Sequence, residues 1–480
     1  MQTYETVIGL EIHVQLSTAS KAFCTDDASF GGAPNTHTSA ISLAHPGTLP
    51  RLNAAAVEGA VRLGLALDCR INRRSCFDRK NYFYADLPKG FQTTQDRAPI
   101  CLGGQYTTGV ASPRTVRIHH IHLEEDAGKS LHDQDAADSL IDLNRAGVPL
   151  LEIVTEPDLR SAEEVAAFMS GIRRVVRWLG ISDGNMEEGS LRCDVNVSMR
   201  KNGETRLGQR CEIKNVNSMR FARRAIEYEV KRQIELLENG GTIVQETRGF
   251  DAATGTTYSL REKEEAHDYR YFPEPDLPPV VLSETYIEDL RTAMPILPEA
   301  LETGFREQYG LPDYDIEMLL QERDTAYYFM EVLEHSGRPE MAKPIANLVI
   351  HKLLPWSTQT DTPLSACPVP PGHWIELLEM IDRGTVSATA AFQRLLPAML
   401  EQPDVAPEGL AAGMQLIQSA DPDMLGKVVD EIIAQNPDKV AAYRKGKKGL
   451  IGFFMGELMK ASKGQADPKA AAQLLEQRLK

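Results

Sequence analysis

A short strand that is apolar on both faces, yet carries one carboxylate at its centre, most constrains how this chain folds. The apolar run comprises Leu150, Leu151, Ile153 and Val154, and Glu152 lies in its middle. Such a run is typical of a strand whose sheet is covered on both faces. An ionised carboxylate buried there is costly without a partner. Glu152 therefore pairs with a cation or coordinates a metal ion, unless it occupies a solvent-facing position of the strand.

Two other segments alternate apolar and polar residues with period two, which predicts half-buried strands. In residues 7–16, Glu11 and His13 fall on the polar face, opposite a row of leucine, isoleucine and valine. In residues 191–200, Arg192 and Asp194 occupy the corresponding polar face. Each predicted strand thus presents polar side chains beside a packed face.

Helical patterns lie between these strands. Ser161 with Glu164 forms a capping box ahead of a helix that runs to Gly180, and a second helix is expected from about Ser218 to Gly240. Strands interrupted in this way favour an α+β fold with a mixed-sheet cradle domain at the N-terminus. Proline-rich segments at 273–279 and 402–407 then interrupt regular structure. We therefore expect three units: the cradle domain at 1–293, a helical domain at 294–408 and a small helical tail domain at 409–480.

The acidic residues form a pattern that suits a metal ion. Glu11 and His13 are two positions apart on one strand face, about 6 to 7 Å. The segment 118–126 reads as the end of a strand with consecutive carboxylates at Glu124, Glu125 and Asp126, and Glu125 shares the parity of the apolar positions before it. One imidazole with three carboxylates is a hard, oxygen-rich set that suits Mg2+ or Mn2+. The alternative is that the acidic turn is simply solvated.

Familiar nucleotide and nucleophile motifs are missing from the sequence. Gly128, Lys129 and Ser130 resemble the end of a P-loop, but position 123, where its first glycine belongs, is leucine. Neither a G-x-G-x-x-G after a strand nor a G-x-S-x-G elbow occurs. The 7 cysteines contain no C-x2-C pair, so we interpret them as bystander thiols. Any phosphoryl transfer would then depend on a metal ion, arginine and lysine arranged on a sheet.

Charge is unevenly distributed along the chain. The formal net charge is -16, which argues against a protein that coats nucleic acid through bulk charge. Residues 439–480, however, contain ten basic and three acidic residues, so this segment carries +7 and the remainder -23. The basic cluster comprises Arg444, Lys445, Lys447 and Lys448. It predicts either a nucleic-acid contact or an ordinary solvated surface.

The N-terminus has neither a basic nor an apolar leader, and no stretch of about 18 apolar residues occurs, so we expect a cytoplasmic protein without a membrane span.

Long, ordered motifs along the whole chain resemble one family, the B subunit of the glutamine-dependent aspartyl/glutamyl-tRNA amidotransferases. They are VIGLEIHVQL, FDRKNYFYADLPKGFQ, HLEEDAGKS, DLNRAGVPLLEIVTEPD, MEEGSLRCDVNVS, EIKNVNS, DYRYFPEPDLPP and, in the tail, AYRKGKKGLIGFFMGELMKASKGQADP. The resemblance implies a carbon–nitrogen ligase that uses glutamine as amide donor. ATP phosphorylates the side-chain carboxylate of Glu-tRNA(Gln) or Asp-tRNA(Asn), and ammonia then displaces phosphate. It also implies two partners, a glutaminase A subunit that supplies ammonia and a small C subunit.

Carried over by residue, the resemblance implies a Mg2+ site at Glu11, His13, Glu125 and Glu152, with Glu124 as the alternative to Glu125. Lys80, Arg192 and Asp194 are the predicted catalytic residues, with Lys80 and Arg192 contacting phosphate unless they form structural salt bridges. The family's tail domain holds the outer part of tRNA, which assigns Arg444, Lys445, Lys447 and Lys448 to phosphate contacts.

Two other functions are compatible with these patterns. One is a tRNA-binding scaffold whose metal site is structural, and the other is a metal-dependent hydrolase that works without partners. The first predicts phosphorylation that is insensitive to loss of Glu152, and the second predicts turnover by the isolated chain.

Overall fold

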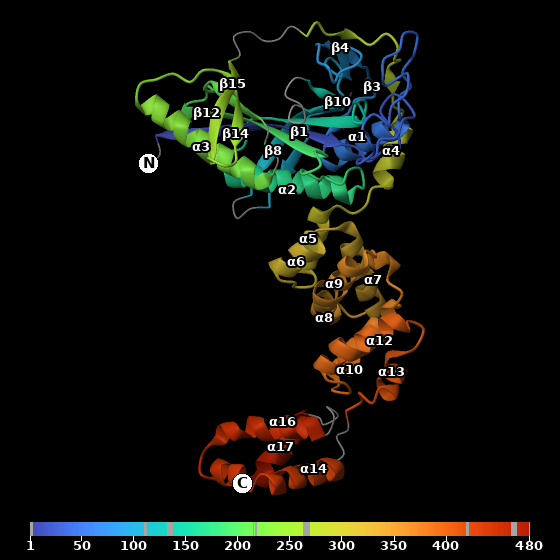
Figure 1. Cartoon of the computed structure of the whole chain (residues 1–480), viewed down its shortest axis with the longest axis vertical. Helices are drawn as coiled ribbons and strands as arrows, with labels where there is room; N and C mark the ends of the chain where they lie inside the picture. Colours follow the sequence, from blue (N-terminus) through green and yellow to red (C-terminus); the bar gives the residue numbers. More distant parts are fainter. Residues whose placement is uncertain are drawn as a thin grey trace. The chain divides into compact units, whose positions relative to one another are not determined.

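The computed structural model describes residues 3–109, 113–131, 138–214, 216, 218–262, 269–418, 422–461 and 468–479 (Figure 1). The chain divides into two compact units, Met1–Pro298 and Glu299–Lys480. The predicted boundary at 293/294 lies close to this division, whereas the boundary at 408/409 stays a prediction. None of the helices in the described residues combines the length and apolarity of a membrane-spanning helix.

A mixed sheet forms the centre of the first unit. Within the described residues its strands lie in the order β15 (Thr256–Glu262), β14 (Glu246–Asp251), β13 (Arg210–Lys214), β12 (Leu191–Lys201), β1 (Tyr4–Gln15), β11 (Pro149–Thr155), β8 (Thr115–Glu125), β6 (Cys101–Leu102) and β2 (Arg70–Ile71), with β7 (Gln105–Thr107) paired to β8. The β13–β14 pair is parallel and its neighbours are antiparallel. This arrangement confirms the predicted α+β class.

Three helices cover one face of the sheet: α1 (Ala54–Ala66), α2 (Ala162–Trp178) and α3 (Met219–Glu238). Figure 1 shows α2 and α3 lying along this face. Both begin where the sequence predicted, because Ser161 accepts a hydrogen bond from the Glu164 amide and Ser218 accepts one from Phe221. The apolar side chains of β1 and β12 pack with these helices in one core. The polar faces of the same strands are therefore directed away from the helices.

One three-stranded sheet, two strand pairs and a helix also belong to the described part of the first unit. They are β4 (Asp78–Asn81), β5 (Phe91–Thr94) and β16 (Phe272–Pro273) in one sheet, β9 (Lys129–Leu131) with β10 (Leu140–Asp142), β3 (Arg74–Ser75) with β17 (Val280–Val281), and α4 (Glu284–Thr292). Lys80 lies on β4, which forms a hairpin with β5. Lys80 and the polar side chains of the large sheet line the same cavity.

The second unit is helical in its described part. Its elements are α5 (Pro298–Glu307), α6 (Asp313–Leu319), α7 (Arg323–Ser336), η1 (Pro339–Met341), α8 (Ala342–Leu348), η2 (Val349–Leu353), α9 (Leu354–Thr360), η3 (Leu364–Ala366), α10 (Pro371–Asp382), α11 (Ala388–Ala390), η4 (Ala391–Leu395), α12 (Leu396–Glu401), α13 (Pro407–Gly413), α14 (Pro422–Gln435), α15 (Pro437–Arg444), η5 (Lys448–Leu450), α16 (Ile451–Ala461) and α17 (Pro468–Leu479). The helical pattern of residues 315–333 is divided between α6 and α7, with a break between Leu319 and Arg323.

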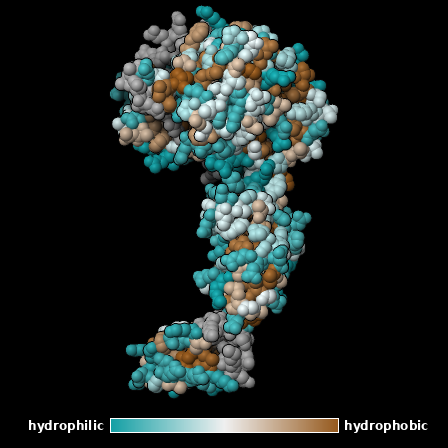
Figure 2. Space-filling model, turned by 45° about the vertical axis from the view of Figure 1, so that its right-hand side comes forward, coloured by the Kyte–Doolittle hydropathy of each residue, from teal (hydrophilic) through white to brown (hydrophobic). Residues whose placement is uncertain are grey.

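The last four α-helices share an apolar cluster of their own, which includes Val429, Phe454, Leu458 and Leu475. Figure 2 shows hydrophobic side chains on these helices framed by hydrophilic ones. This cluster is what a small helical tail domain requires.

Candidate functional site

The polar face of the sheet brings together side chains from strands that are far apart in the sequence. His13 on β1 lies directly opposite Glu152 on β11, and Glu152 in turn lies opposite His122 on β8. On the other side of β1, His13 pairs with Arg192 and Glu11 with Asp194. Cross-strand partners point to the same face of a sheet. The period-two pattern of β1 and β12 therefore predicted the correct face for Glu11, His13, Arg192 and Asp194.

Five side chains on this face form a compact group, the carboxylate–histidine cluster: Glu11, His13, His122, Glu124 and Glu152. His13 Nε2 lies 3.3 Å from Glu152 Oε2, 3.8 Å from Glu11 Oε1 and 3.9 Å from Glu124 Oε1. His122 Nε2 lies 3.5 Å from Glu152 Oε2 and 3.3 Å from Glu124 Oε2. Glu152 is only 9% exposed, which places it among the buried carboxylates that need a partner.

Mutual contact shifts the pKa values within the cluster in opposite directions. Burial opposes a charged imidazole at His13, but the hydrogen bond to Glu152 and the nearby carboxylates outweigh it and raise the pKa of His13 to about 9. Burial and the charge of Glu152 raise the pKa of Glu11 to about 7. Burial also opposes ionisation of Glu152, yet His122 and His13 lower its pKa to about 2. At neutral pH the cluster thus holds protons that a cation could replace.

The donor set fits a divalent cation. In each of two groups, one of Glu11, His13 and Glu152 and one of His122, Glu124 and Glu152, the ligand atoms lie within 4.8 Å of one another. Carboxylate oxygens with an imidazole nitrogen are typical ligands of Mg2+ or Mn2+, and neither group includes a thiolate.

His122 was missed by sequence reasoning. It lies in the run Ile118–Glu125 and has the same parity as Glu124, which is two positions along the strand. The period of two shows that His122 and Glu124 share one face of the strand. It does not show which of the two faces is directed to the site.

Glu125 is not brought to the cluster, whereas its alternative, Glu124, is. Glu125 has the parity of Ile121 and Leu123, which are fully buried in the core, so it faces away from His13. Its carboxylate contacts Lys89 Nζ and accepts a hydrogen bond of 2.8 Å from the Thr93 amide. The sequence placed Glu125 on the correct parity, with Ile121 and Leu123, but on β8 that parity faces the core and not the cluster.

The three predicted catalytic residues line a polar cavity of about 830 Å³ together with every member of the cluster except His122. Lys80 is half-buried, and its Nζ lies 5.0 Å from the centre of the Tyr269 ring. Although burial opposes its charge, Glu124 raises the pKa of Lys80. Arg192 Nη2 donates to Asp126 at 2.7 Å, and Lys214 Nζ donates to Asp194 at 2.9 Å. Arg192 and Asp194 therefore do form ion pairs, within the cavity.

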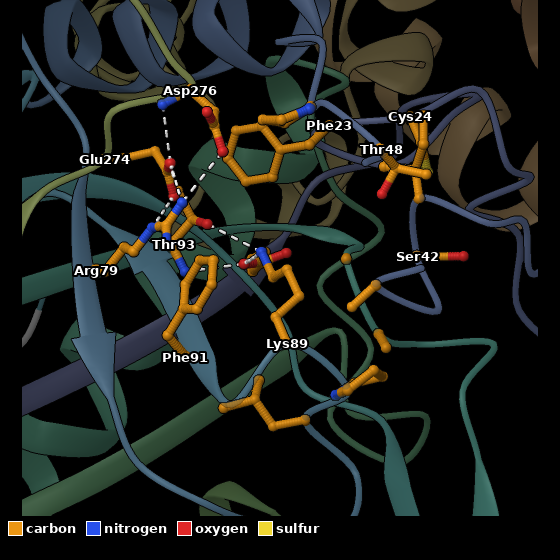
Figure 3. Close-up of a pocket in the computed structure, with 18 of the residues that line it drawn as sticks. Phe23, Cys24, Ser42, Thr48, Arg79, Lys89, Phe91, Thr93, Glu274 and Asp276 are labelled. Carbon is orange, nitrogen blue, oxygen red and sulfur yellow. Dashed lines mark hydrogen bonds and ion pairs between the residues drawn. The ribbon is translucent and has the colours of Figure 1, made fainter. Parts of the chain in front are cut away.

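A second, smaller cavity of about 240 Å³ lies on the side to which Glu125 points. Figure 3 shows Arg79 held by Glu274 and Asp276, and Lys89 extended beside Phe91 and Thr93. Arg79 contacts Glu274 at 2.7 Å and Asp276 at 3.2 Å. Asp126 lines both cavities, so the two spaces approach each other at the end of β8.

The predicted tRNA contacts lie at the end of α15 and in the turn that follows. Arg444, Lys445, Lys447 and Lys448 are all exposed. Lys448 Nζ lies 4.2 Å from the centre of the buried Tyr443 ring, which fixes part of this turn against the helical group. The four cations are thus accessible together on a folded support.

Comparison with known proteins matches both units of the chain. A family model described as the GatB/GatE catalytic domain matches residues 6–288, and one described as the GatB domain matches residues 327–479. The chain is 48% identical over 481 residues to the B subunit of the aspartyl/glutamyl-tRNA(Asn/Gln) amidotransferase of Geobacter sulfurreducens, covering 99% of each chain. It is 46% identical over 473 residues to the protein of the same name from Thermodesulfovibrio yellowstonii, covering 98% of each.

Proposed function

Because the chain belongs to the B-subunit family of the aspartyl/glutamyl-tRNA(Asn/Gln) amidotransferases, we propose that it is the subunit that activates and amidates misacylated tRNA. ATP phosphorylates the side-chain carboxylate of Glu-tRNA(Gln) or Asp-tRNA(Asn), and ammonia displaces the phosphate to form the amide. The enzyme is then a carbon–nitrogen ligase with glutamine as amide donor. A glutaminase A subunit supplies the ammonia, and a small C subunit completes a heterotrimer that works in the cytoplasm.

One observation carries this proposal: four members of the carboxylate–histidine cluster and three cationic side chains line a single cavity within the part of the chain matched to the catalytic domain. The cations are Lys80, Arg192 and Lys214. Phosphoryl transfer between two anions depends on positioning and on neutralising charge, and this cavity offers both without a P-loop.

Mg2+ would be held by Glu11, His13, Glu124 and Glu152, with His122 adjacent to the last two. When bound, it would supply the charge that offsets the phosphates of ATP. The residues of the chain do the rest. Lys80 keeps its proton and presents an ammonium group to phosphate, while Asp126 fixes the guanidinium of Arg192 and Asp194 fixes the ammonium of Lys214.

The second unit would bind the tRNA away from its reactive end. The exposed cations Arg444, Lys445, Lys447 and Lys448 suit contacts to backbone phosphates, which position a nucleic acid without reading its sequence. This accounts for nucleic-acid binding by a chain whose net charge is -16, because the binding charge is local.

Glu152→Gln in the assembled complex tests the proposal. We expect ATP-dependent phosphorylation of misacylated tRNA to fall at least about 100-fold, because the neutral amide removes the shared carboxylate of both ligand groups. Binding of tRNA should stay within twofold. Glu238→Gln, the same change at an exposed position of α3, serves as the control. Unchanged phosphorylation by Glu152→Gln would instead favour a scaffold with a structural metal site.

A further inference from the structure

One exposed aromatic ring at the edge of the reaction cavity has no role in the cluster or in the core. Phe30 is 74% exposed and lines the cavity together with Ala28, Ser29, Gly31 and Gly32. Single exposed apolar residues are common on protein surfaces. Phe30 differs from such residues because it stands at the rim of a polar cavity and on a loop that is firmly held.

Hydrogen bonds join the part of the loop that follows the ring to β10 and to the turn after it. Asn35 donates its backbone amide to Asp142 Oδ1 at 3.1 Å and its side chain to the Ile141 carbonyl at 2.9 Å, and it accepts from the Leu143 amide at 2.8 Å. In the same part of the loop, the Asn144 side chain donates to the Ala33 carbonyl at 2.7 Å. Before the ring, the Ser29 amide donates to Asp27 Oδ1 at 2.8 Å.

The fully buried Lys21 anchors the far end of the same loop. Its ammonium group donates to the carbonyl of His37 at 2.7 Å and to that of Leu143 at 3.2 Å. His37 also donates its backbone amide to Asn144 Oδ1 at 2.9 Å. A loop held this way costs conformational entropy, yet it orders an apolar ring that is left in solvent.

The sequence after the ring keeps it uncovered. Gly31 has φ of +90°, a conformation that residues with a Cβ rarely adopt, and Gly32 packs where a Cβ would collide with the His37 ring. Neither glycine carries a side chain that could lie over Phe30. The loop therefore presents an ordered aromatic face at the cavity rim, which is a preorganised stacking surface.

We propose that Phe30 is a stacking residue for an adenine ring in the reaction cavity, an inference that rests on the proposed function. Both polyanionic reactants carry that ring, ATP as its base and tRNA as its 3′-terminal adenosine. Flat bases stack on aromatic side chains in a way that needs no hydrogen-bond donor from the protein, which matches a phenyl ring. The phosphates of either reactant are then directed to the cations of the same cavity.

The test compares Phe30→Ala, Phe30→Tyr and the control Leu207→Ala, an exposed apolar side chain outside the cavity, in the assembled complex. We expect Phe30→Ala to raise one KM about tenfold, within the range for loss of one base–aromatic stack, with kcat within twofold. Phe30→Tyr should restore the wild-type KM. A change confined to the KM for ATP assigns the ring to ATP, and one confined to the KM for Glu-tRNA(Gln) assigns it to the terminal adenosine.

Other outcomes overturn the assignment. If both KM values are unchanged in Phe30→Ala, the ring is not a base-binding residue. If Phe30→Tyr fails to restore the KM, or the Phe30→Ala complex no longer assembles on gel filtration, the ring supports protein structure or a partner contact. The wild-type complex separates this result from the proposed function, because a wild type that forms no amide refutes that function, whereas an active wild type with an unaffected Phe30→Ala variant refutes only the stacking role.

Discussion

Cation binding at the carboxylate–histidine cluster should strengthen steeply with pH, because the incoming ion displaces protons. In the metal-free protein the pKa of His13 is about 9 and that of Glu11 is about 7. A metal ion binds the neutral imidazole and the ionised carboxylate. Because the pKa of His13 lies two units above pH 7, only about 1% of His13 is neutral at that pH. The apparent affinity for the cation is therefore weakened about 100-fold, or by about 2.7 kcal/mol.

The sign and the window follow from these two values. Between pH 7 and 9 one proton must leave His13, so raising the pH from 7 to 8 should increase the apparent Mg2+ affinity about tenfold. Below pH 7 Glu11 is also protonated, and the dependence steepens toward about 100-fold per pH unit. Above pH 9 it should level off, since both groups have then lost their protons.

Isothermal titration calorimetry at pH 8 in two buffers of different ionisation enthalpy measures the released protons directly. We expect about one proton per bound cation for the wild type and for the surface control Glu238→Gln. An affinity that changes less than about twofold between pH 7 and 8, with no proton release, would refute the reasoning that His13 is both a proton carrier and a ligand.

Three further predictions concern the cavity, the tail and the core. Lys80→Met should lower kcat for tRNA phosphorylation about 100-fold, because it removes a charge that Glu124 maintains against burial, and Lys80→Arg should recover part of it; equal kcat in all three proteins, measured by phosphate release, would contradict this. Reversing the charge of Lys447 and Lys448 to glutamate should raise the Kd for tRNA about tenfold and flatten its salt dependence in filter binding, while kcat at saturating tRNA stays constant; an unchanged salt slope would count against phosphate contacts. Phe168→Ala should lower the free energy of unfolding by about 3–5 kcal/mol in urea titrations, since this fully buried ring packs edge-on against Tyr106, and a loss below about 1 kcal/mol would contradict its place in the core.

Local patterns in the sequence predicted the strands that carry the site. Alternation over 7–16 and 191–200 corresponds to β1 and β12, and the capping serine at position 161 begins α2 as expected. The sequence also indicated that Glu152 is buried, because apolar residues flank it on both sides. These features depend only on neighbours in the chain.

The features that could not be predicted from the sequence depend on contacts between distant segments of the chain. Which row of β8 faces the site follows from its register with β11, so Glu124 and His122 belong to the cluster and Glu125 does not. The ion pairs of Arg192 with Asp126 and of Asp194 with Lys214 join residues on different strands or turns. The break between α6 and α7 likewise interrupts a continuous helical pattern.

The strand order explains how three carboxylates can be held close together before any cation arrives. His13 and Glu11 lie on β1, next to the strand that carries Glu152, and His122 contacts both Glu124 and Glu152. An imidazolium at these positions offsets the repulsion that would otherwise separate the carboxylates. A divalent cation at the proposed site would therefore replace these protons within the same arrangement of side chains. Under the proposed function, the protonated histidines would hold the carboxylates together while the sheet folds, and the cation would be needed only for phosphoryl transfer. The two histidines would thus link folding of the sheet to the proposed chemistry.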